Sequence, residues 1–181
     1  LWSLSSGTQK PPGKDSSENS KKRRKRNSKA LAIIHDDLVL TYTGSRIDAY
    51  SAKTGEPVWV AKPGGGGSMR NQDWFVAQDC VWVAASGGIH GYALADGKLA
   101  KTIDPRSVQS RGHHLRCYQS KATERFLVTQ FRGAEFVSLT DEVHTNNDWV
   151  RGPCRYGVMP SHGLLYVPPQ TRFSSPATKP T

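Results

Sequence analysis

Short apolar runs alternate with turn residues along the middle of the chain. Leu38–Tyr42 and Ile47–Tyr50 are two such runs, with a turn around Gly44 between them, and a second turn at Gly55 precedes Val58–Val60. Runs of this length, rich in β-branched and aromatic residues and bounded by Gly and Asp, are strand and hairpin signals. Helical spacing is absent over any window of useful length. The pattern therefore predicts a meander of antiparallel strands.

The same pattern recurs along the chain. Residues 37–50 align with residues 79–92 at an offset of 42, a third copy at 125–139 follows at an offset of 45, and the start of a fourth appears at 163–167. A repeat of about 40 to 45 residues with about four short strands is typical of a propeller blade. Each blade buries its faces against its neighbours and cannot bury them alone.

The sequence therefore predicts an all-β fold, a partial β-propeller of about 3.5 four-stranded blades with a disordered basic N-terminal tail. The two ends are rich in polar residues and Pro and cannot bury enough apolar surface to fold. The expected boundaries are a basic tail at 1–30, blades at about 31–75, 76–118 and 119–161, a partial blade at 162–169, and a disordered polar tail at 170–181.

A motif in the first copy points to a family. Residues 49–59, Ala-Tyr-Ser-Ala-Lys-Thr-Gly-Glu-Pro-Val-Trp, resemble the A-x-D-A-x-T-G-x-x-x-W segment of the PQQ-like repeat found in quinoprotein-type and BamB-like β-propellers. In that family the Thr-Gly closes a hairpin and the Trp docks between blades, so the resemblance implies these roles for Gly55 and Trp59. The Gly-His and Trp-Asp pairs of the alternative WD40 repeat are absent at the repeat spacing.

The chain departs from the family pattern at three positions. Ser51 stands where Asp is usual, and Lys101 and Asn146 occupy the Trp59 position in the second and third copies. The stretch from His113 to Tyr166 is further similar to a planctomycete-type branch of these proteins. Closed propellers have about 4 to 8 blades, and the chain does not begin with Met, so we expect a fragment of a longer protein.

The resemblance raises the question of whether the chain binds PQQ. Quinoprotein dehydrogenases hold PQQ on the propeller axis with a stacking Trp, a calcium ion, a catalytic carboxylate and often an adjacent-cysteine disulfide. The chain has no Cys-Cys pair and no Asp/Asn cluster with calcium-loop spacing. We therefore predict no cofactor and no catalytic, cofactor-binding or metal residues, with PQQ and Ca²⁺ entering only if the chain is part of a quinoprotein-like oxidoreductase.

The segment richest in potential ligand and catalytic side chains, residues 111–118, lies between the second and third copies. His114 and Cys117 are spaced as a metal pair, but a structural zinc site needs four ligands and the sequence offers no second pair. A polar loop between blades is the alternative, in which His113, His114 and Arg116 form a contact for an anion or another ligand. Three cysteines, an odd number, do not describe a disulfide framework.

The charge of the chain is concentrated in its first 30 residues. The whole sequence carries 25 Lys and Arg against 15 Asp and Glu, and residues 1–30 hold nine of the basic residues against two acidic ones. A basic run in this tail would attract a polyanion through counterion release, or would serve as a solvated linker. The run consists of Lys21, Lys22, Arg23, Arg24, Lys25 and Arg26.

These observations favour a non-enzymatic binding or scaffold module that contacts a protein or a small ligand. The alternatives are a fragment of a PQQ-dependent oxidoreductase and a polyanion-binding protein that uses its tail. The expected partner is another protein or the missing blades of the full-length chain. No window approaches the ~18 apolar residues of a membrane span, and the family resemblance implies an extracytoplasmic location although no signal peptide is visible.

Overall fold

The computed structural model describes residues 31–64, 73–109 and 118–169. These residues form fourteen strands and one short 3-10 helix, η1, at Pro105–Ser107. The first sheet contains β1 (Leu31–His35), β2 (Leu38–Tyr42), β3 (Ile47–Ser51) and β4 (Pro57–Ala61); the second contains β5 (Phe75–Ala77), β6 (Cys80–Ala85), β7 (Gly88–Ala93) and β8 (Leu99–Ile103). The third contains β9 (Lys121–Ala122), β10 (Phe126–Thr129), β11 (Ala134–Ser138) and β12 (Thr145–Asn147), and the fourth contains β13 (Met159–Ser161) and β14 (Leu164–Tyr166).

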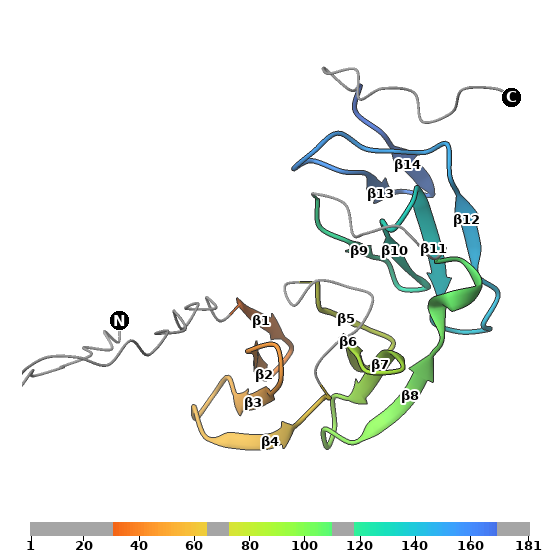
Figure 1. Cartoon of the computed structure of the whole chain (residues 1–181). Helices are drawn as coiled ribbons and strands as arrows, with labels where there is room; N and C mark the ends of the chain where they lie inside the picture. The colour runs from red at the N-terminus through yellow and green to blue at the C-terminus, as the bar shows by residue number, and fades with distance from the viewer. Residues whose placement is uncertain (1–30, 65–72, 110–117, 170–181) are drawn as a thin grey trace, which may run out of the picture.

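The sheets follow one another along an arc, each facing the next (Figure 1). Strands β1, β5, β9 and β13 lie on the inner side of the arc, whereas β4, β8 and β12 lie on its outer side. Every sheet is an antiparallel meander in sequence order. The predicted all-β fold with four-stranded blades and a final half-blade is therefore confirmed. The predicted tails at 1–30 and 170–181 lie outside the described residues.

The first two sheets match each other in detail. Leu38 and Cys80, the first residues of β2 and β6, are 42 positions apart, as the aligned copies require. Both sheets also carry an irregularity in the pairing of their third and fourth strands, after Ala49 in the first and after Gly91 in the second. The third sheet has a regular register there, so that Asn146 pairs with Glu135. The first and second sheets are thus the closest structural equivalents in the described chain.

Serine replaces the usual aspartate in the turn after the third strand. Ser51 Oγ accepts hydrogen bonds from the backbone amides of Lys53 and Thr54, at 3.3 and 3.2 Å. Ser138 Oγ does the same for Thr140 and Asp141, both at 3.3 Å. A short side-chain oxygen that accepts backbone N–H groups stabilises a tight turn. The departure at Ser51 therefore keeps the function of the turn.

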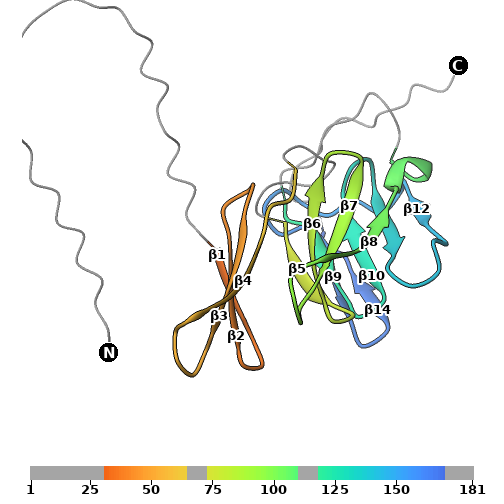
Figure 2. The same cartoon turned by 90° about the horizontal axis from the view of Figure 1, so that it is seen from below.

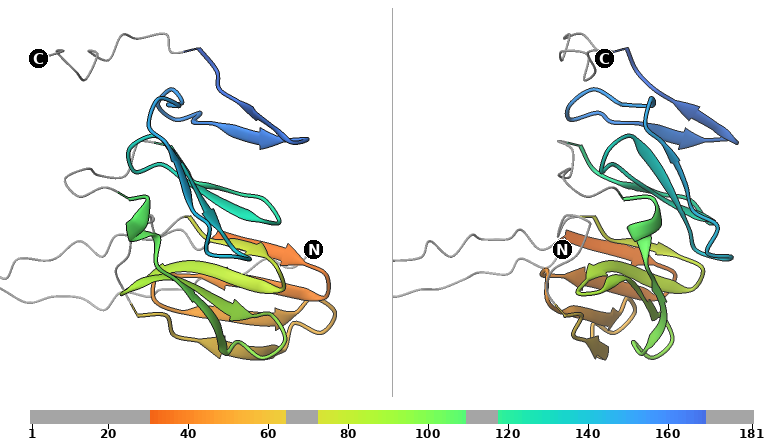
Figure 3. Two further views of the ribbon diagram at one scale, coloured as in Figure 1. Left: turned by 90° about the vertical axis from the view of Figure 1, so that its right-hand side faces the viewer. Right: turned by 45° about the vertical axis from the view of Figure 1, so that its right-hand side comes forward.

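Three apolar clusters hold the sheets together, one at each interface between neighbouring sheets. The first joins Leu40, Ile47 and Trp59 of the first sheet to Val81 and Val83 of the second. Figure 2 shows the first sheet at one end of this arrangement, and Figure 3 shows β13 and β14 at the other end. Because the clusters lie between sheets, each inner sheet is buried on both faces and each end sheet on one.

Single side chains cross from the outermost strand of one sheet to the turn of the next. Trp59 on β4 donates a hydrogen bond from Nε1 to the carbonyl oxygen of Leu94, at 2.7 Å. Lys101 on β8, which the aligned copies place at the Trp59 position, donates from Nζ to the carbonyl oxygen of Leu139, at 3.3 Å. The position of Trp59 between the first and second sheets agrees with the role that the family resemblance implies for it.

Candidate functional site: an axial cavity and two uncovered sheet faces

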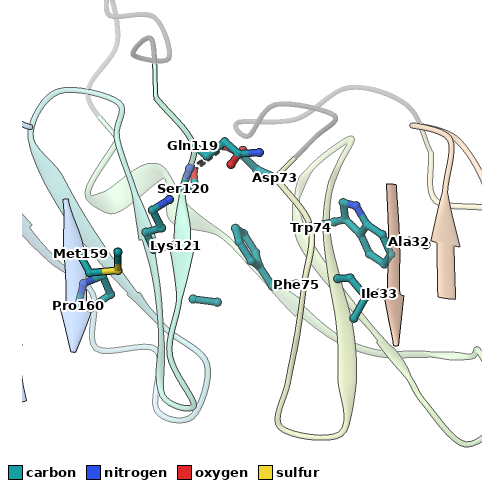
Figure 4. Close-up of a pocket in the computed structure, with 11 residues that line it drawn as sticks. Ala32, Ile33, Asp73, Trp74, Phe75, Gln119, Ser120, Lys121, Met159 and Pro160 are labelled. Atoms are coloured by element: carbon teal, nitrogen blue, oxygen red, sulfur yellow. Dashed lines mark hydrogen bonds between the residues drawn. The ribbon is translucent and has the colours of Figure 1, made fainter. Parts of the chain in front are cut away.

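The inner strands of the four sheets surround a cavity of about 370 Å³. Its walls include Ile33 of β1, Phe75 of β5, Lys121 of β9 and Pro160 of β13 (Figure 4). The cavity exists because the inner strands converge on the concave side of the arc. It lies where a β-propeller has its axis, and it is a candidate binding site because concave sites with a few polar groups are where small ligands bind.

Asp73 is the most unusual residue in this cavity. It lies two residues before β5 and is 2% exposed. Its Oδ2 accepts hydrogen bonds from the backbone amide of Ser120 at 3.2 Å and from Ser120 Oγ at 2.8 Å, and Gln130 Nε2 donates to Ser120 Oγ at 3.0 Å. Asp73 Oδ1 is buried and has no hydrogen-bond partner among the described residues. A buried polar atom without a partner costs free energy, so this oxygen is available to a donor.

The rest of the cavity combines apolar walls with one cation. Trp74 is buried, Met159 is 57% exposed, and both line the cavity together with the partly buried Lys121. A ligand here would meet a fixed carboxylate oxygen, an ammonium group and aromatic surface. This arrangement suits a small molecule that carries a hydrogen-bond donor.

The described residues hold no acidic cluster of the kind that binds calcium in the quinoprotein enzymes, and the prediction that the chain holds no cofactor stays a prediction. Calcium takes several oxygen ligands, whereas no group of three or more His, Cys, Asp or Glu gathers anywhere in the described residues. In the axial cavity the carboxylate of Asp73 stands alone and is already bonded to Ser120. No chemical step through PQQ can be derived from this chain's described residues.

A second, smaller cavity of about 270 Å³ lies beside β7 and η1. Asp104 and Arg106 line it and form a paired contact, with Arg106 Nε 2.8 Å from Asp104 Oδ1 and a terminal guanidinium nitrogen 2.6 Å from Oδ2. The side-chain hydrogen bonds from Arg106, helped by its backbone amide, lower the pKa of Asp104 to about 2. Asp104 also caps η1, because its side chain accepts a hydrogen bond from the Arg106 backbone amide. The two charged groups are paired with each other, so they offer little to a ligand.

The site residues predicted from the sequence lie outside the described residues. These are the contact loop with His113, His114 and Arg116, and the basic run Lys21, Lys22, Arg23, Arg24, Lys25 and Arg26. The described chain resumes at Tyr118, and Gln119 and Ser120 directly after it line the axial cavity. The contact loop and the polyanion contact therefore stay predictions.

Two features escaped the sequence reasoning, the first because it depends on a distant contact and the second because its local signal is weak. Asp73 has no distinctive neighbours in sequence, and its partner Ser120 is 47 positions away. Glu135 is fully buried, and its carboxylate accepts backbone hydrogen bonds from Phe131, Arg132 and Gly133 at 2.7 to 2.9 Å. The only signal for this role in the sequence is the position of Glu135 directly after the loop 131–133, whose amides it binds.

The cysteines are in different states. Cys80 is free and buried, and desolvation raises the pKa of its thiol. Cys154 is disulfide-bonded. An odd number of cysteines gave no reason to expect a disulfide framework, but it does not exclude a single bond.

The two ends of the sheet stack expose apolar side chains. On the first sheet Ile34, Val58 and Val60 are 75%, 51% and 44% exposed. On the fourth sheet Leu164 and Tyr166 are 61% and 52% exposed. We call the face of the first sheet that carries Ile34, Val39, Tyr50, Val58 and Val60 the outward face. Such surfaces on neighbouring strands mark interaction sites when they are contiguous.

Comparison with known proteins adds a similarity of fold. No family model matches the chain, and no curated protein matches it. Nineteen chains of solved structures match, among them the crystal structure of BamB from Moraxella catarrhalis, with a TM-score of 0.42 and 19% sequence identity. The match covers 64% of this chain and 35% of that one, so the chain spans about a third of the length of that protein.

Proposed function

We propose that this chain is a β-propeller binding module that holds another protein on the faces at the two ends of its sheet stack, which no described residue covers. The proposal rests on a difference in burial between equivalent positions of the first and second sheets. Val39 and Tyr50 on the outward face are only partly buried, whereas Val81 and Tyr92, 42 positions further on, are buried against the first sheet. The outward face of the first sheet therefore carries, at these two positions, the same residue types that the second sheet buries against the first.

The fourth sheet supports the same proposal from the other end. Met159 pairs with Tyr166, and Ser161 pairs with Leu164, on one face of a two-stranded sheet. Leu165, whose side chain lies on the opposite face, packs against the cluster that contains Val128. One face of the half-blade is thus buried on the third sheet, and the other exposes apolar side chains. The outer edge of β14 also has no strand beside it among the described residues, and an unpaired edge invites strand addition.

Dye binding and self-association test the proposal. We expect the full chain to bind bis-ANS and to associate in a concentration-dependent way in sedimentation velocity, because apolar faces of this kind attract the dye and each other. The double variant Val58→Lys with Val60→Glu should lose a large part of both signals. The matched control is Val143→Lys, a change at a still more exposed valine away from the outward face. A chain that binds no dye and stays monomeric at every concentration would overturn the proposal.

A second candidate function is the binding of a small molecule in the axial cavity, and the unpartnered Asp73 Oδ1 favours it. Primary amines and alcohols are the simplest probes because they donate hydrogen bonds to a carboxylate. Titrating ethanolamine and glycerol should shift the amide resonances of Ser120 and Lys121 in the full chain. Asp73→Asn should weaken the effect of the amine more than that of the alcohol. Equal, unsaturable shifts in both proteins would exclude this site.

The remaining hypotheses come from the sequence. Polyanion binding through residues 21–26 is tested by nucleic-acid binding across a salt series with and without residues 1–30, since a phosphate-binding tail gives a steep salt dependence. Quinone chemistry in a longer protein is tested by adding PQQ and Ca²⁺ and measuring quinone absorbance and alcohol-dependent dye reduction.

We also propose an extracytoplasmic location, supported by the disulfide-bonded Cys154. No helix in the described ranges is long and apolar enough to cross a membrane.

A further inference from the structure

We infer that the axial cavity binds a zwitterionic amino acid with an apolar side chain, its ammonium group on Asp73 and its carboxylate on Lys121. This inference rests on the second candidate function, the binding of a small molecule in that cavity, and it names the class of the ligand. It follows from the two charged side chains that line the cavity and from the apolar residues around them.

The two charged side chains have opposite signs and do not neutralise each other. Asp73 and Lys121 both line the cavity, and no other described residue with a charge does so. Asp73 forms no ion pair among the described residues, and Lys121 forms neither an ion pair nor a side-chain hydrogen bond with them. A charge that is withdrawn from water without a partner costs free energy. Both groups are therefore available to a ligand.

The carboxylate of Asp73 is held in one position. Its Oδ2 atom accepts two hydrogen bonds from Ser120, whose hydroxyl is bonded in turn by Gln130, and all three residues are 2% exposed. These bonds leave Oδ1 as the acceptor for a ligand, already in place before binding. A single oxygen does not provide the several ligands that a calcium ion takes. It suits an N–H donor, and a charged ammonium group makes the stronger hydrogen bond.

Lys121 brings a positive charge to the same end of the cavity. It is the first residue of β9 and directly follows Ser120, whose hydroxyl is 2.8 Å from Asp73 Oδ2. Successive residues of a strand are only about 3.3 Å apart, and Figure 4 shows the Lys121 nitrogen directed toward Ser120. A ligand that is bonded to Asp73 therefore lies within reach of the Lys121 ammonium group, which attracts a carboxylate.

A zwitterion satisfies both charged groups at once. A simple amine would bond to Asp73 but would be repelled by Lys121, and a simple carboxylate would be attracted by Lys121 but repelled by Asp73. An α-amino acid carries its ammonium and carboxylate groups on one carbon atom. This spacing matches two opposite charges at one end of a small cavity.

The other walls of the cavity accommodate an apolar side chain. Ile33, Phe75, Met159 and Pro160 all line it, so burying an aliphatic group against them is favourable. The volume of about 370 Å³ lies near the lower end of the range of about 300 to 1,000 Å³ that is usual for small-molecule sites. A single amino acid therefore fits better than a nucleotide or a long peptide.

One exposed side chain controls access to Asp73. Asp73 Oδ1 is buried, so a neighbouring side chain has to move before a ligand reaches it. Gln119 directly precedes Ser120, lines the cavity, and is drawn next to Asp73 in Figure 4. It is exposed and forms no hydrogen bond with a described residue, so moving it costs little. Gln119→Ala should therefore bind the ligand at least as tightly as the parent chain does.

Leucine and three analogues test the inference. Isoamylamine is leucine without its carboxylate, and 4-methylpentanoate is leucine without its ammonium group. In calorimetric titrations of the full chain we expect leucine to bind at least roughly tenfold more tightly than either, because each charged group adds a hydrogen bond. N,N,N-trimethyl-leucine keeps both charges but has no N–H group, and it should bind as weakly as 4-methylpentanoate. Leucine that binds no more tightly than isoamylamine or 4-methylpentanoate would overturn the inference.

Two substitutions assign the two contacts. Asp73→Asn keeps an acceptor oxygen for Ser120 but replaces the other oxygen by an NH₂ group, so it should remove the preference for leucine over 4-methylpentanoate. Lys121→Met should remove the preference for leucine over isoamylamine. Lys98→Met is the matched control, because Lys98 is exposed and does not line the cavity, and it should keep both preferences.

The lysine variant is the decisive one. Lys121 forms no side-chain hydrogen bond with a described residue, so Lys121→Met should stay folded even if Asp73→Asn does not. A preference for leucine over isoamylamine that is unchanged in Lys121→Met would show that the carboxylate lies elsewhere, and the inference would be wrong.

Failure of this inference can be told from failure of the second candidate function. If ethanolamine, isoamylamine and leucine all leave the amide resonances of Ser120 and Lys121 unchanged, the cavity binds no such molecule and both are wrong. If the amines bind saturably but the carboxylate of leucine adds no affinity, the cavity is an amine site and only this inference is wrong.

Discussion

The Nε1 atom of Trp59 donates a hydrogen bond of 2.7 Å to the carbonyl oxygen of Leu94, and this contact joins the outermost strand of the first sheet to a turn of the second. Lys101 makes the corresponding bond to Leu139 at the next interface. The chain therefore makes one kind of inter-sheet contact with two different side chains. The turn beneath differs accordingly, with Gly97 under the indole and Glu142 at the lysine interface.

The pairing of donor and turn residue can be tested at the second interface. Lys101→Trp alone should lower the stability, because Glu142 occupies the place that a glycine holds beneath Trp59. Adding Glu142→Gly should recover that loss and stabilise the protein by about 1 kcal/mol or more over the single variant, since the indole gains buried area. Urea denaturation of the two variants and of Glu142→Gly alone measures the coupling. Additive effects of the two changes would show that the sites do not communicate.

Much of this fold could be predicted from the sequence because the signals were local. Alternating apolar positions, turn glycines and the spacing of 42 give the strands and the blades, and the segment ending at Trp59 pointed to its docking role. The substitution at Lys101 appeared only as a departure, because the sequence does not show which carbonyl group its ammonium reaches.

The axial cavity could not be predicted in this way. Asp73 and Ser120 come together only because the inner strands of different sheets converge, and no sequence spacing encodes that contact. The exposure of the turn at Gly55 could not be predicted either. Gly55 aligns with Gly97, and only the structure shows that Gly55 is exposed whereas Gly97 is covered by the Trp59 ring.

Glu135 should be essential for the third sheet. Its carboxylate accepts three backbone hydrogen bonds and one from Thr129 Oγ1 at 3.0 Å, and it is fully buried. Glu135→Gln places an amide NH₂ group among these donors and should cost at least about 2 kcal/mol of unfolding free energy. Glu142→Gln, at an exposed glutamate, is the matched control and should change little. Chemical denaturation checks both, and equal stability of the two variants would contradict this role.

The Asp104–Arg106 pair predicts a specific pH dependence. Hydrogen bonds from Arg106 lower the pKa of Asp104 in the folded protein to about 2, below its ordinary value of about 3.9. The stabilisation from this pair is therefore fully present above about pH 4 and is lost as the pH falls through about 2. A carboxyl NMR titration should show this midpoint, and Arg106→Ala should raise it toward the ordinary value. Lys98→Ala, which removes the partner of Asp96 instead, should leave the midpoint of Asp104 unchanged.

The thiols should fall into two classes. Cys80 is buried and its raised pKa disfavours the reactive thiolate. Cys80 in the native protein should therefore react slowly with DTNB and become reactive on unfolding, whereas Cys154, which is disulfide-bonded, should react only after reduction. A non-reduced peptide map that contains Cys154 as a free thiol in protein from an oxidising compartment would contradict this expectation.

The central claim is that an indole seated over a turn glycine joins one blade to the next. A double-mutant cycle with Trp59→Ala and Gly97→Ala tests it, with Gly55→Ala as the control for strain at a positive φ. In the parent chain Gly97→Ala should cost about 1 to 3 kcal/mol more than Gly55→Ala, because its methyl group overlaps the Trp59 ring. In the Trp59→Ala background the two alanine substitutions should cost the same within about 0.5 kcal/mol. An unchanged difference between them in that background would contradict the claim.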